Sequence, residues 1–269
     1  MVTPVSRLWN ENWGGYVLFN WDTYFNAAMF ALDNKFLSFA NAIAITNELT
    51  PEGFVPNYSA ALSMGKSFDR SQPPVGGLIC NMIYKKYPEK WFIETVFDSL
   101  LRWNRWWEKE RDNNGYLSWG SDPYTYRNNS NSKQAAMWES GLDNSPLFDS
   151  ANLKKKKNTL ELASVGLLSL YISDCQYLAH MAEILERFEE QNELNTRAAK
   201  YSEKLKTLWD DESGIYRDKD LVTGNFSKRL SPTSFYPLLT GIPTMKQARR
   251  MIDEHFMNPN EFYGEYMLP

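Results

Sequence analysis

The stretch LELASVGLLSLYISDCQYLAHMAEILERF, residues 160–188, decides the fold class. Its apolar side chains recur three and four positions apart, which is the spacing of one face of an α-helix. These apolar positions are Leu160, Ala163, Leu167, Leu170, Leu178, Met181, Leu185 and Phe188. One polar residue, Asp174, interrupts the stripe. We therefore expect a long helix that buries one face.

The same spacing recurs along the rest of the chain. A second stripe runs from Ile93 to Trp107 and is interrupted by Asn104, and a third runs from Leu194 to Leu208. Shorter helical segments fit residues 24–32, 36–48, 75–86 and 245–256. These patterns predict seven helices and no convincing series of alternating strands. We expect an all-α chain whose helices form an incomplete toroid of antiparallel hairpins, with long loops at one end.

Two connections, residues 50–74 and 113–158, are too long for simple turns between helices. Because they hold many Trp, Tyr and Pro residues, we expect ordered loops that carry function. A weak echo links WEKERDNNGY, residues 107–116, to WDDESGIY, residues 209–216. In both, an acidic turn follows a Trp, reaches a Gly and is followed by an aromatic residue. This echo indicates either a repeated helix-and-turn unit or simply common turn chemistry.

Composition excludes several classes of function. The 269 residues include 29 Lys and Arg against 33 Asp and Glu, and the net charge of −4 disfavours general nucleic-acid binding. No apolar run approaches the ~20 residues of a membrane helix. Two cysteines make no disulfide framework, so we expect a cytoplasmic protein. Two histidines without paired ligand spacing give no reason to expect a metal, and we expect no cofactor.

Aromatic residues, at 15% of the chain, either fill the core or line a carbohydrate site. Four segments near junctions of loops and helices combine aromatic and polar residues. They are GGYVLFNWDTYF (residues 14–25), GFVPNY (residues 53–58), SFDRSQPP (residues 67–74) and MWESGLDNSP (residues 137–146). If the helices form hairpins in a ring, such junctions gather at one end of it.

The last segment offers two carboxyl groups, Glu139 and Asp143, four positions apart with Gly141 between them. A carboxyl group placed among aromatic rings such as Trp138 is desolvated, which raises its pKa toward the value that a general acid requires. The alternative is structural, because Asp143 or Asn144 could cap a following turn.

The third segment places Arg70 and Gln72 on a loop just before Pro73 and Pro74, which favour the start of a helix. Guanidinium and amide groups suit sugar hydroxyls or a carboxylate. An ion pair of Arg70 with Asp69 or Asp22 is the structural alternative. Trp21 and Asp22 are equally ambiguous, as a core residue and as a helix cap.

These four segments, in this order, resemble the glycoside hydrolases built on an (α/α)6 barrel. The group is the one related to mannosylglycerate and glucosylglycerate hydrolases, in the clan of processing α-glucosidases, and the motifs are also similar to those of trehalases. The resemblance extends from Trp9 to Pro269. It implies inverting hydrolysis of a small α-glucoside or α-mannoside, without a metal.

The resemblance also assigns roles. Asp143 matches the aspartate that protonates the glycosidic oxygen, and the other matching positions fall on the sugar site. The expected sugar-binding residues are Tyr16, Trp21, Asp22, Asn57, Tyr58, Asp69, Arg70, Gln72, Trp138 and Glu139.

Inversion needs a second carboxyl group as general base. The family's base is a glutamate beyond a Tyr-Trp-Arg-Gly stretch, which this chain lacks, and Glu265 does not match its position. We therefore expect residues 1–269 to be the N-terminal portion of one catalytic domain without its C-terminal helices, inactive by itself. The alternatives are a non-catalytic sugar-binding remnant and a fragment of a trehalase-type or α-glucosidase-type enzyme. A small carbohydrate is the expected partner, with no nucleic acid and no membrane.

Overall fold

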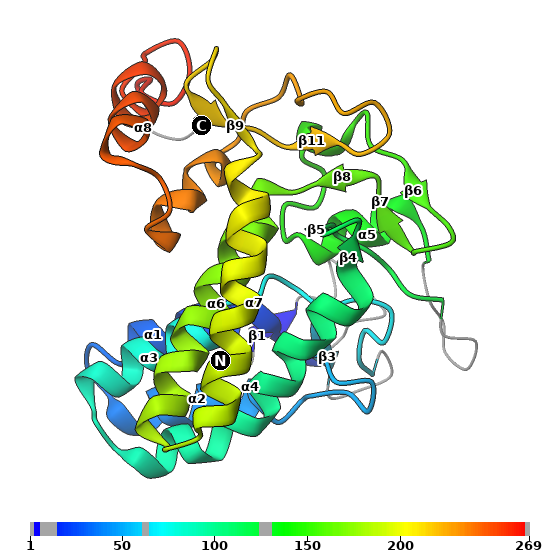
Figure 1. Cartoon of the computed structure of the whole chain (residues 1–269). Helices are drawn as coiled ribbons and strands as arrows, with labels where there is room; N and C mark the ends of the chain where they lie inside the picture. Colours follow the sequence, from blue (N-terminus) through cyan, green and yellow to red (C-terminus); the bar gives the residue numbers. More distant parts are fainter. Residues whose placement is uncertain (1–2, 6–14, 61–64, 124–130, 267–269) are drawn as a thin grey trace.

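The fold is described by a computed structural model that covers residues 3–5, 15–60, 65–123 and 131–266 (Figure 1). The α-helices are α1 (Asn20–Phe30), α2 (Lys35–Thr46), α3 (Gly76–Lys86), α4 (Lys90–Arg111), α5 (Lys133–Glu139), α6 (Val165–Ile184), α7 (Phe188–Lys206) and α8 (Met245–Arg250). Two 3-10 helices, η2 (Pro146–Phe148) and η3 (Pro232–Thr240), and a π-helical continuation of α8, η4 (Met251–Phe256), complete the described helices. The prediction of an all-α chain is confirmed, although the described residues hold eight α-helices where the sequence indicated seven, because α5 lies within the connection expected to be a loop.

Short strands are added to this helical frame. One antiparallel sheet has the order β1-β2-β3, formed by β1 (Thr3–Val5), β2 (Gly15–Phe19) and β3 (Tyr58–Ala60). The other strands form two-stranded pairs: β4 (Asp112–Asn113) with β5 (Tyr116–Leu117), β6 (Leu153–Lys154) with β7 (Thr159–Leu160), β9 (Trp209–Asp210) with β10 (Ile215–Tyr216), and β8 (Leu162–Ala163) with β11 (Lys219–Asp220).

The helices pack as consecutive hairpins. Helix α1 packs on α2, α3 on α4 and α6 on α7, each pair joined by a short turn, so the members of a pair run antiparallel. The first members also contact one another in order: α1 touches α3, α3 touches α6, and α6 touches η3. This layer of first members, backed by α2, α4 and α7, is the arrangement of a helical toroid. Figure 1 shows α6 and α7 as one long pair that connects the other helices to the hairpins and α8.

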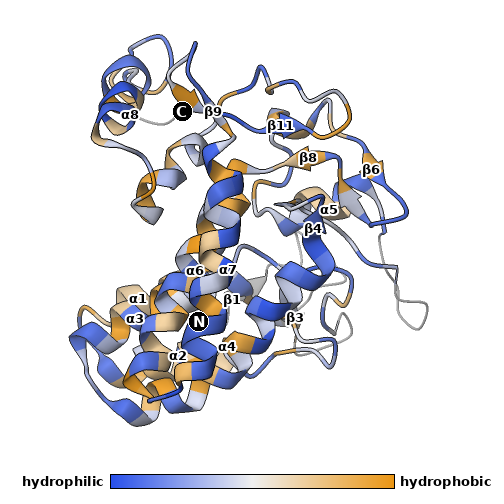
Figure 2. Ribbon diagram, viewed as in Figure 1, coloured by the Kyte–Doolittle hydropathy of each residue, from blue (hydrophilic) through white to orange (hydrophobic). Residues whose placement is uncertain are grey.

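The layered arrangement explains the apolar stripes. One continuous core holds large side chains from both layers, among them Trp103, Trp107, Tyr24 and Tyr171. Figure 2 shows hydrophobic and hydrophilic residues alternating around the helices, as expected where each helix buries one face.

The two polar residues that interrupted the predicted stripes bond to each other. Asn104 Nδ2 donates to Asp174 Oδ2 at 2.7 Å, and Asp174 Oδ1 accepts from the backbone N–H of Gly77 at 3.0 Å. Burial raises the pKa of Asp174 to about 7. Asp174 thus caps the first turn of α3 from a neighbouring helix, which satisfies an N–H group that the helix itself leaves unpaired.

The predicted helix over residues 160–188 is shorter than expected. Leu160 and Ala163 lie in β7 and β8, and Phe188 begins α7. Helix α6 starts after Ser164, whose hydroxyl accepts from Leu167 N. The backbone N–H of Val165 donates to Asp218 Oδ1 at 2.8 Å, and burial raises the pKa of Asp218 to about 7. These two caps end the strand region and fix the first turn of α6.

The sequence echo is a structural repeat. After α4 the chain forms the hairpin β4–β5, and after α7 it forms the hairpin β9–β10. Both turns contain a glycine with positive φ, Gly115 at 83° and Gly214 at 75°. Since Gly adopts this conformation without strain, the shared acidic turn and Gly encode the same helix-plus-hairpin unit.

Candidate active site

The four sequence segments meet at the N-terminal ends of the first-layer helices. Residues 15–25 of the first segment, whose Gly14 lies outside the described residues, form β2 and the start of α1, and segment 67–74 leads directly into α3. Segment 137–146 spans the end of α5 and the turn before η2. Hydrogen bonds join the four segments: Asn20 N donates to the carbonyl of Asn57 at 3.0 Å, and Asn57 N donates to that of Arg70 at 3.2 Å. Ser71 N donates to Glu139 Oε1 at 3.0 Å.

Trp21 joins three of these segments. Its backbone N–H donates to Gln72 Oε1 at 3.2 Å. Its ring lies against Gly141, where an added Cβ would come within 2.3 Å of Trp21 Cζ2. Gly141 has φ of 70°, so both the turn and the close approach of the ring require glycine.

Asp143 is presented by this turn. It is exposed and has φ of 41°, in the left-handed region that Asp tolerates better than most residues. Desolvation by the surrounding protein raises the pKa of its carboxyl, the charge of Arg70 opposes the rise, and the charge of Asp22 adds to it. Ser145, not Asp143 or Asn144, caps η2, because its hydroxyl accepts from Leu147 N.

Asp22 lies in the first turn of α1 and is exposed. Desolvation by the protein around its carboxyl raises the pKa of Asp22. Its side chain is not the helix cap that the sequence allowed, since the N-cap position is Phe19. Two acidic groups of raised pKa, Asp22 and Asp143, therefore share one electrostatic environment with Arg70.

Arg70 is buried and held on several sides. Its guanidinium carbon lies 4.8 Å from the centre of the Trp138 ring and 5.8 Å from that of Tyr58. Nη1 donates to both oxygens of Asp69, at 3.0 and 2.9 Å, and Nε donates to Asn57 Oδ1 at 3.2 Å. The ion pair with Asp69 is thus present, and it orients Arg70 within the same cluster as Asp143.

Glu139 has a different position from the one expected of a sugar ligand. It has no exposed surface, and its carboxylate accepts from Arg111, from Ser71 N at 3.0 Å and from Gly120 N at 2.6 Å. The prediction that Glu139 binds substrate is therefore wrong in this structure, because no part of its side chain reaches solvent. Its hydrogen bonds instead join the loops that carry the other segments.

Tyr16 lies outside this network of contacts. It is on β2 and is 61% exposed. Asn57 and Tyr58 lie inside the network through their contacts with Arg70. Arg111 and Asp122, both buried, are members of the network that the sequence analysis did not identify.

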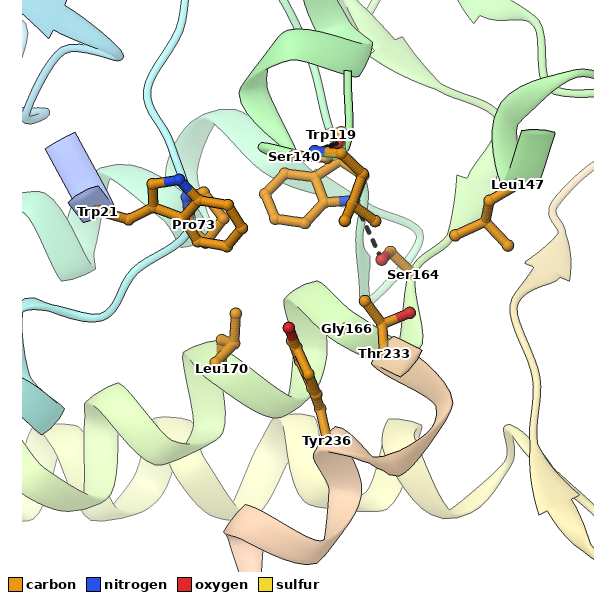
Figure 3. A pocket seen from close by; sticks show the side chains of 11 residues that line it. Trp21, Pro73, Trp119, Ser140, Leu147, Ser164, Gly166, Leu170, Thr233 and Tyr236 are labelled. Atoms are coloured by element: carbon orange, nitrogen blue, oxygen red, sulfur yellow. Dashed lines mark hydrogen bonds between the residues drawn. The ribbon is translucent and has the colours of Figure 1, made fainter. Parts of the chain in front are cut away.

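A pocket opens beside Trp21 (Figure 3). Pro73, Ser140 and Leu142 from the predicted segments line it. The remaining lining residues come from other parts of the chain: Trp119, Leu147, Ser164, Gly166, Leu170, Thr233 and Tyr236. Figure 3 shows the Tyr236 hydroxyl pointing into the pocket and Trp119 Nε1 donating to Ser164 Oγ, at 3.1 Å. Its accessible volume of about 10 Å³ is no larger than one water molecule needs, so in this structure it is a gap among aromatic and apolar side chains beside Trp21.

No group of three or more His, Cys, Asp or Glu side chains in the described ranges is placed to hold a metal ion. Within the same residues, no helix is both long and apolar enough to cross a membrane.

Comparison with known proteins agrees with this geometry. The model of the mannosylglycerate hydrolase MGH1-like glycoside hydrolase domain matches residues 15–269. The chain belongs to this family. Its fold is that of the helical toroids, as the solved structures below also show.

Two curated relatives and two solved structures illustrate the similarity. The chain is 25% identical to a mannosylglycerate hydrolase of Rubrobacter radiotolerans, over 67% of this chain and 50% of the relative. It is 23% identical to a periplasmic trehalase of Escherichia coli, over 87% of this chain and 47% of the relative. The structure of a GH63 mannosylglycerate hydrolase from Thermus thermophilus superposes with a TM-score of 0.78 at 18% identity, covering 93% of this chain and 72% of the other. A neutral trehalase from Saccharomyces cerevisiae superposes with a TM-score of 0.68 at 17% identity, covering 88% and 52%. The chain spans about half the length of the curated relatives it matches.

Proposed function

We propose that this chain carries the acid half of an inverting α-glycosidase that acts on a small α-glucoside or α-mannoside, such as glucosylglycerate or mannosylglycerate. The observation that carries the proposal is the placement of Asp143. Its carboxyl is accessible, its pKa is raised, and it shares its surroundings with Arg70 and Asp22. A carboxyl group whose pKa lies above its ordinary value holds more readily the proton that a departing glycosidic oxygen must receive.

In this proposal Asp143 is the general acid. Protonation of the glycosidic oxygen lets the aglycone leave as a neutral alcohol while positive charge develops on the sugar ring. The carboxylate of Asp22 stabilises that charge when ionised, and Trp21 and Trp138 cover the apolar faces of the sugar. Arg70 and Gln72 bind hydroxyls, with Asn57, Tyr58 and Asp69 holding Arg70 in place. Tyr16 is proposed to contact the aglycone side, because it is exposed and lies on β2 outside the cluster.

Inversion requires a base about 6.5–9.5 Å from the acid, with a water molecule between the base and the sugar. We propose that this base lies in sequence beyond residue 269, in the part of the domain that the relatives possess and that the chain does not span. Exposed apolar residues on two first-layer elements support further helical packing there. Phe25 and Met29 are exposed on α1, Leu32 is exposed just after it, and Leu238 and Leu239 are exposed on η3. Residues 1–269 alone are then expected to bind sugar weakly and to turn over very slowly or not at all.

A second candidate is hydrolysis of a trehalose-type disaccharide. The trehalase relatives of similar identity favour it, and so do the Trp-Asp and Ser-Gln-Pro-Pro motifs that both groups share. A third candidate is a non-catalytic sugar-binding protein that retains Asp143 without a base. Substrate preference separates the first two, and turnover separates both from the third.

The test uses the protein extended through its natural coding sequence and, separately, residues 1–269. Both are assayed for turnover of glucosylglycerate, mannosylglycerate and trehalose, and for sugar binding through tryptophan fluorescence. We expect turnover in the extended protein, with inversion of the anomeric configuration, and its loss in Asp143→Asn. Asp149→Asn, an exposed aspartate six positions further on, is the matched control and should keep full activity. Equal turnover by residues 1–269 would mean that a carboxylate inside the chain acts as the base.

The remaining proposals concern surroundings and location. We propose a small carbohydrate as the partner, with no nucleic acid, no membrane and no cofactor. We also propose a cytoplasmic location, supported by the two cysteines, Cys80 and Cys175, which are unpaired thiols. Detection of the natural protein in separated cell fractions tests the location directly.

A further inference from the structure

Arg111, the last residue of α4, is the centre of a buried ionic cluster. It has no exposed surface. Nε and Nη2 donate to the two oxygens of Glu139 at 2.7 and 2.8 Å. Nη1 and Nη2 donate to the two oxygens of Asp122 at 3.1 and 2.8 Å, and Nη1 also donates to the carbonyl of Glu110 at 3.4 Å. Every N–H group of the guanidinium therefore has an acceptor.

The first carboxylate leads to Asp143. Glu139 lies four positions before Asp143, and the turn between them is closed by its own hydrogen bonds. Gly141 N donates to the carbonyl of Trp138 at 3.2 Å, and Leu142 N donates to Ser140 Oγ at 3.1 Å. Since Glu139 is fixed by Arg111 and the turn is closed, the position of Asp143 follows from that of Glu139.

The second carboxylate leads to Arg70. The backbone N–H of Asp122 donates to the carbonyl of Asp69 at 2.6 Å, and the hydroxyl of the preceding Ser121 donates to Asp69 Oδ2 at 3.0 Å. Asp69 in turn accepts from Arg70 Nη1 with both oxygens. Asp122 therefore fixes the segment that holds Arg70.

We propose that Arg111 is a positioning residue that sets the spacing between Arg70 and Asp143 through these two separate carboxylates. The inference rests on the acid role proposed above for Asp143, and it adds a residue that touches neither substrate nor the reacting atoms. A buried Arg with two bidentate carboxylates is well suited to this task, because its planar fork fixes direction as well as distance.

The proposal predicts how the pKa of Asp143 responds when either of the two connections from Arg111, the Asp122 arm or the Glu139 arm, is loosened. The charged groups that act on Asp143 from the elements around it are Arg70, which lowers its pKa, and Asp22 on α1, which raises it. Loosening the Asp122 arm lets Arg70 move away, so the pKa of Asp143 should rise. Loosening the Glu139 arm moves Asp143 away from Arg70, so the pKa of Asp143 should rise in this case too. Removal of a carboxylate charge by itself acts in the opposite direction, because a nearby negative charge raises the pKa of an acid.

The experiment is a titration of Asp143 by NMR in protein labelled with ¹³C at aspartate carboxyls, with Asp143→Asn used to assign the signal. Asp122→Asn and Glu139→Gln each keep the shape of the side chain and remove its charge. We expect the pKa of Asp143 to rise by about half a unit in both variants, a threefold change in proton affinity. Arg111→Lys keeps the positive charge but not the planar fork. When Asp122→Asn or Glu139→Gln is combined with Arg111→Lys, the pKa of Asp143 should no longer shift by the same amount as it does when Arg111 is present.

Arg197→Lys is the matched control. Arg197 is also buried and also donates to three side chains, Glu108, Asn104 and Glu193, but these lie between α4 and α7. It should lower stability without moving the Asp143 titration. A fall of the Asp143 pKa in either arm variant, or no shift in either while circular dichroism shows native helix content, would overturn the proposal. If Glu139→Gln does not fold, Asp122→Asn decides alone, since only a rise supports the proposal. The titration needs no turnover, so failure of the proposed glycosidase activity is scored separately by the activity assay.

Discussion

Replacement of Gly141 by Ala tests the contact that joins Trp21 to the Asp143 turn. An added Cβ at this position would lie 2.3 Å from Trp21 Cζ2 and 2.7 Å from Cε2, well inside van der Waals contact. Alanine also has to adopt φ of 70°, which costs about 1–2 kcal/mol. Overpacking of a filled site typically costs a further 1–3 kcal/mol. We expect Gly141→Ala to lower the free energy of unfolding by roughly 2–5 kcal/mol, the sum of these two effects.

Gly241 provides a matched control. It has the same φ of 70°, at the end of η3, but nothing lies within 4 Å of an added Cβ. Gly241→Ala therefore carries the backbone cost without the collision with a ring, and the gain from restricting the unfolded chain is equal in both variants. Urea denaturation followed by tryptophan fluorescence measures both, and the comparison is valid if the m-values agree. Equal destabilisation by the two substitutions would refute the placement of the Trp21 ring against Gly141.

Three other substitutions test the roles of two buried carboxyl groups, Asp218 and Asp174, and of the exposed carboxyl group of Asp143. Burial raises the pKa of Asp218 to about 7, so the unfolded chain releases this proton at lower pH than the folded chain does. The free energy of unfolding therefore falls as pH rises from about 4 to 7, by up to ~1.4 kcal/mol per pH unit. Asp218→Asn should flatten this slope in denaturation midpoints measured from pH 4 to 8. Gly77→Ala should destabilise the protein, because the added Cβ would lie 2.7 Å from Asp174 Oδ1. Helix propensity alone predicts about 1 kcal/mol of stabilisation for this change. A raised denaturation midpoint would therefore contradict the cap by Asp174. Asp143→Asn should leave the melting temperature nearly unchanged, since the residue is exposed and Asn tolerates its left-handed backbone; a large loss would indicate a structural role for Asp143.

Local periodicity was sufficient to predict most of the helices. Stripes of apolar residues have one physical cause, the burial of one helix face, and that cause acts within each segment. The interruptions Asn104 and Asp174 also carried information, because a polar residue on a buried stripe needs a partner, and here each is the other's partner. The ends of the long helix were less predictable, since Leu160 and Ala163 are equally apolar in a strand.

The four segments of the site could be predicted from the sequence, but the buried residues that hold these segments together could not. Motif residues such as Trp21, Gln72 and Gly141 come together as the four segments suggested. Arg111 gave no signal, because it lies in the charged run EKERD, residues 108–112, which is typical of a solvated helix end. Its burial depends on Glu139, 28 positions later, and no pattern within a short window can register a contact at that distance.

That separation has a consequence for the order in which a nascent chain acquires its parts. Helix α4 and the hairpin β4–β5 involve only neighbouring residues and can form as soon as they emerge from the ribosome. At about 5–20 residues per second, the 28 residues between Arg111 and Glu139 take roughly 1–6 seconds to synthesise. Through that interval the guanidinium remains hydrated, and the Asp143 turn does not yet exist. The hairpin β4–β5 is thus a product of local chemistry completed early. The Asp143 turn forms only after Glu139 has been synthesised, and the pocket beside Trp21 forms later still, because Thr233 and Tyr236 line it.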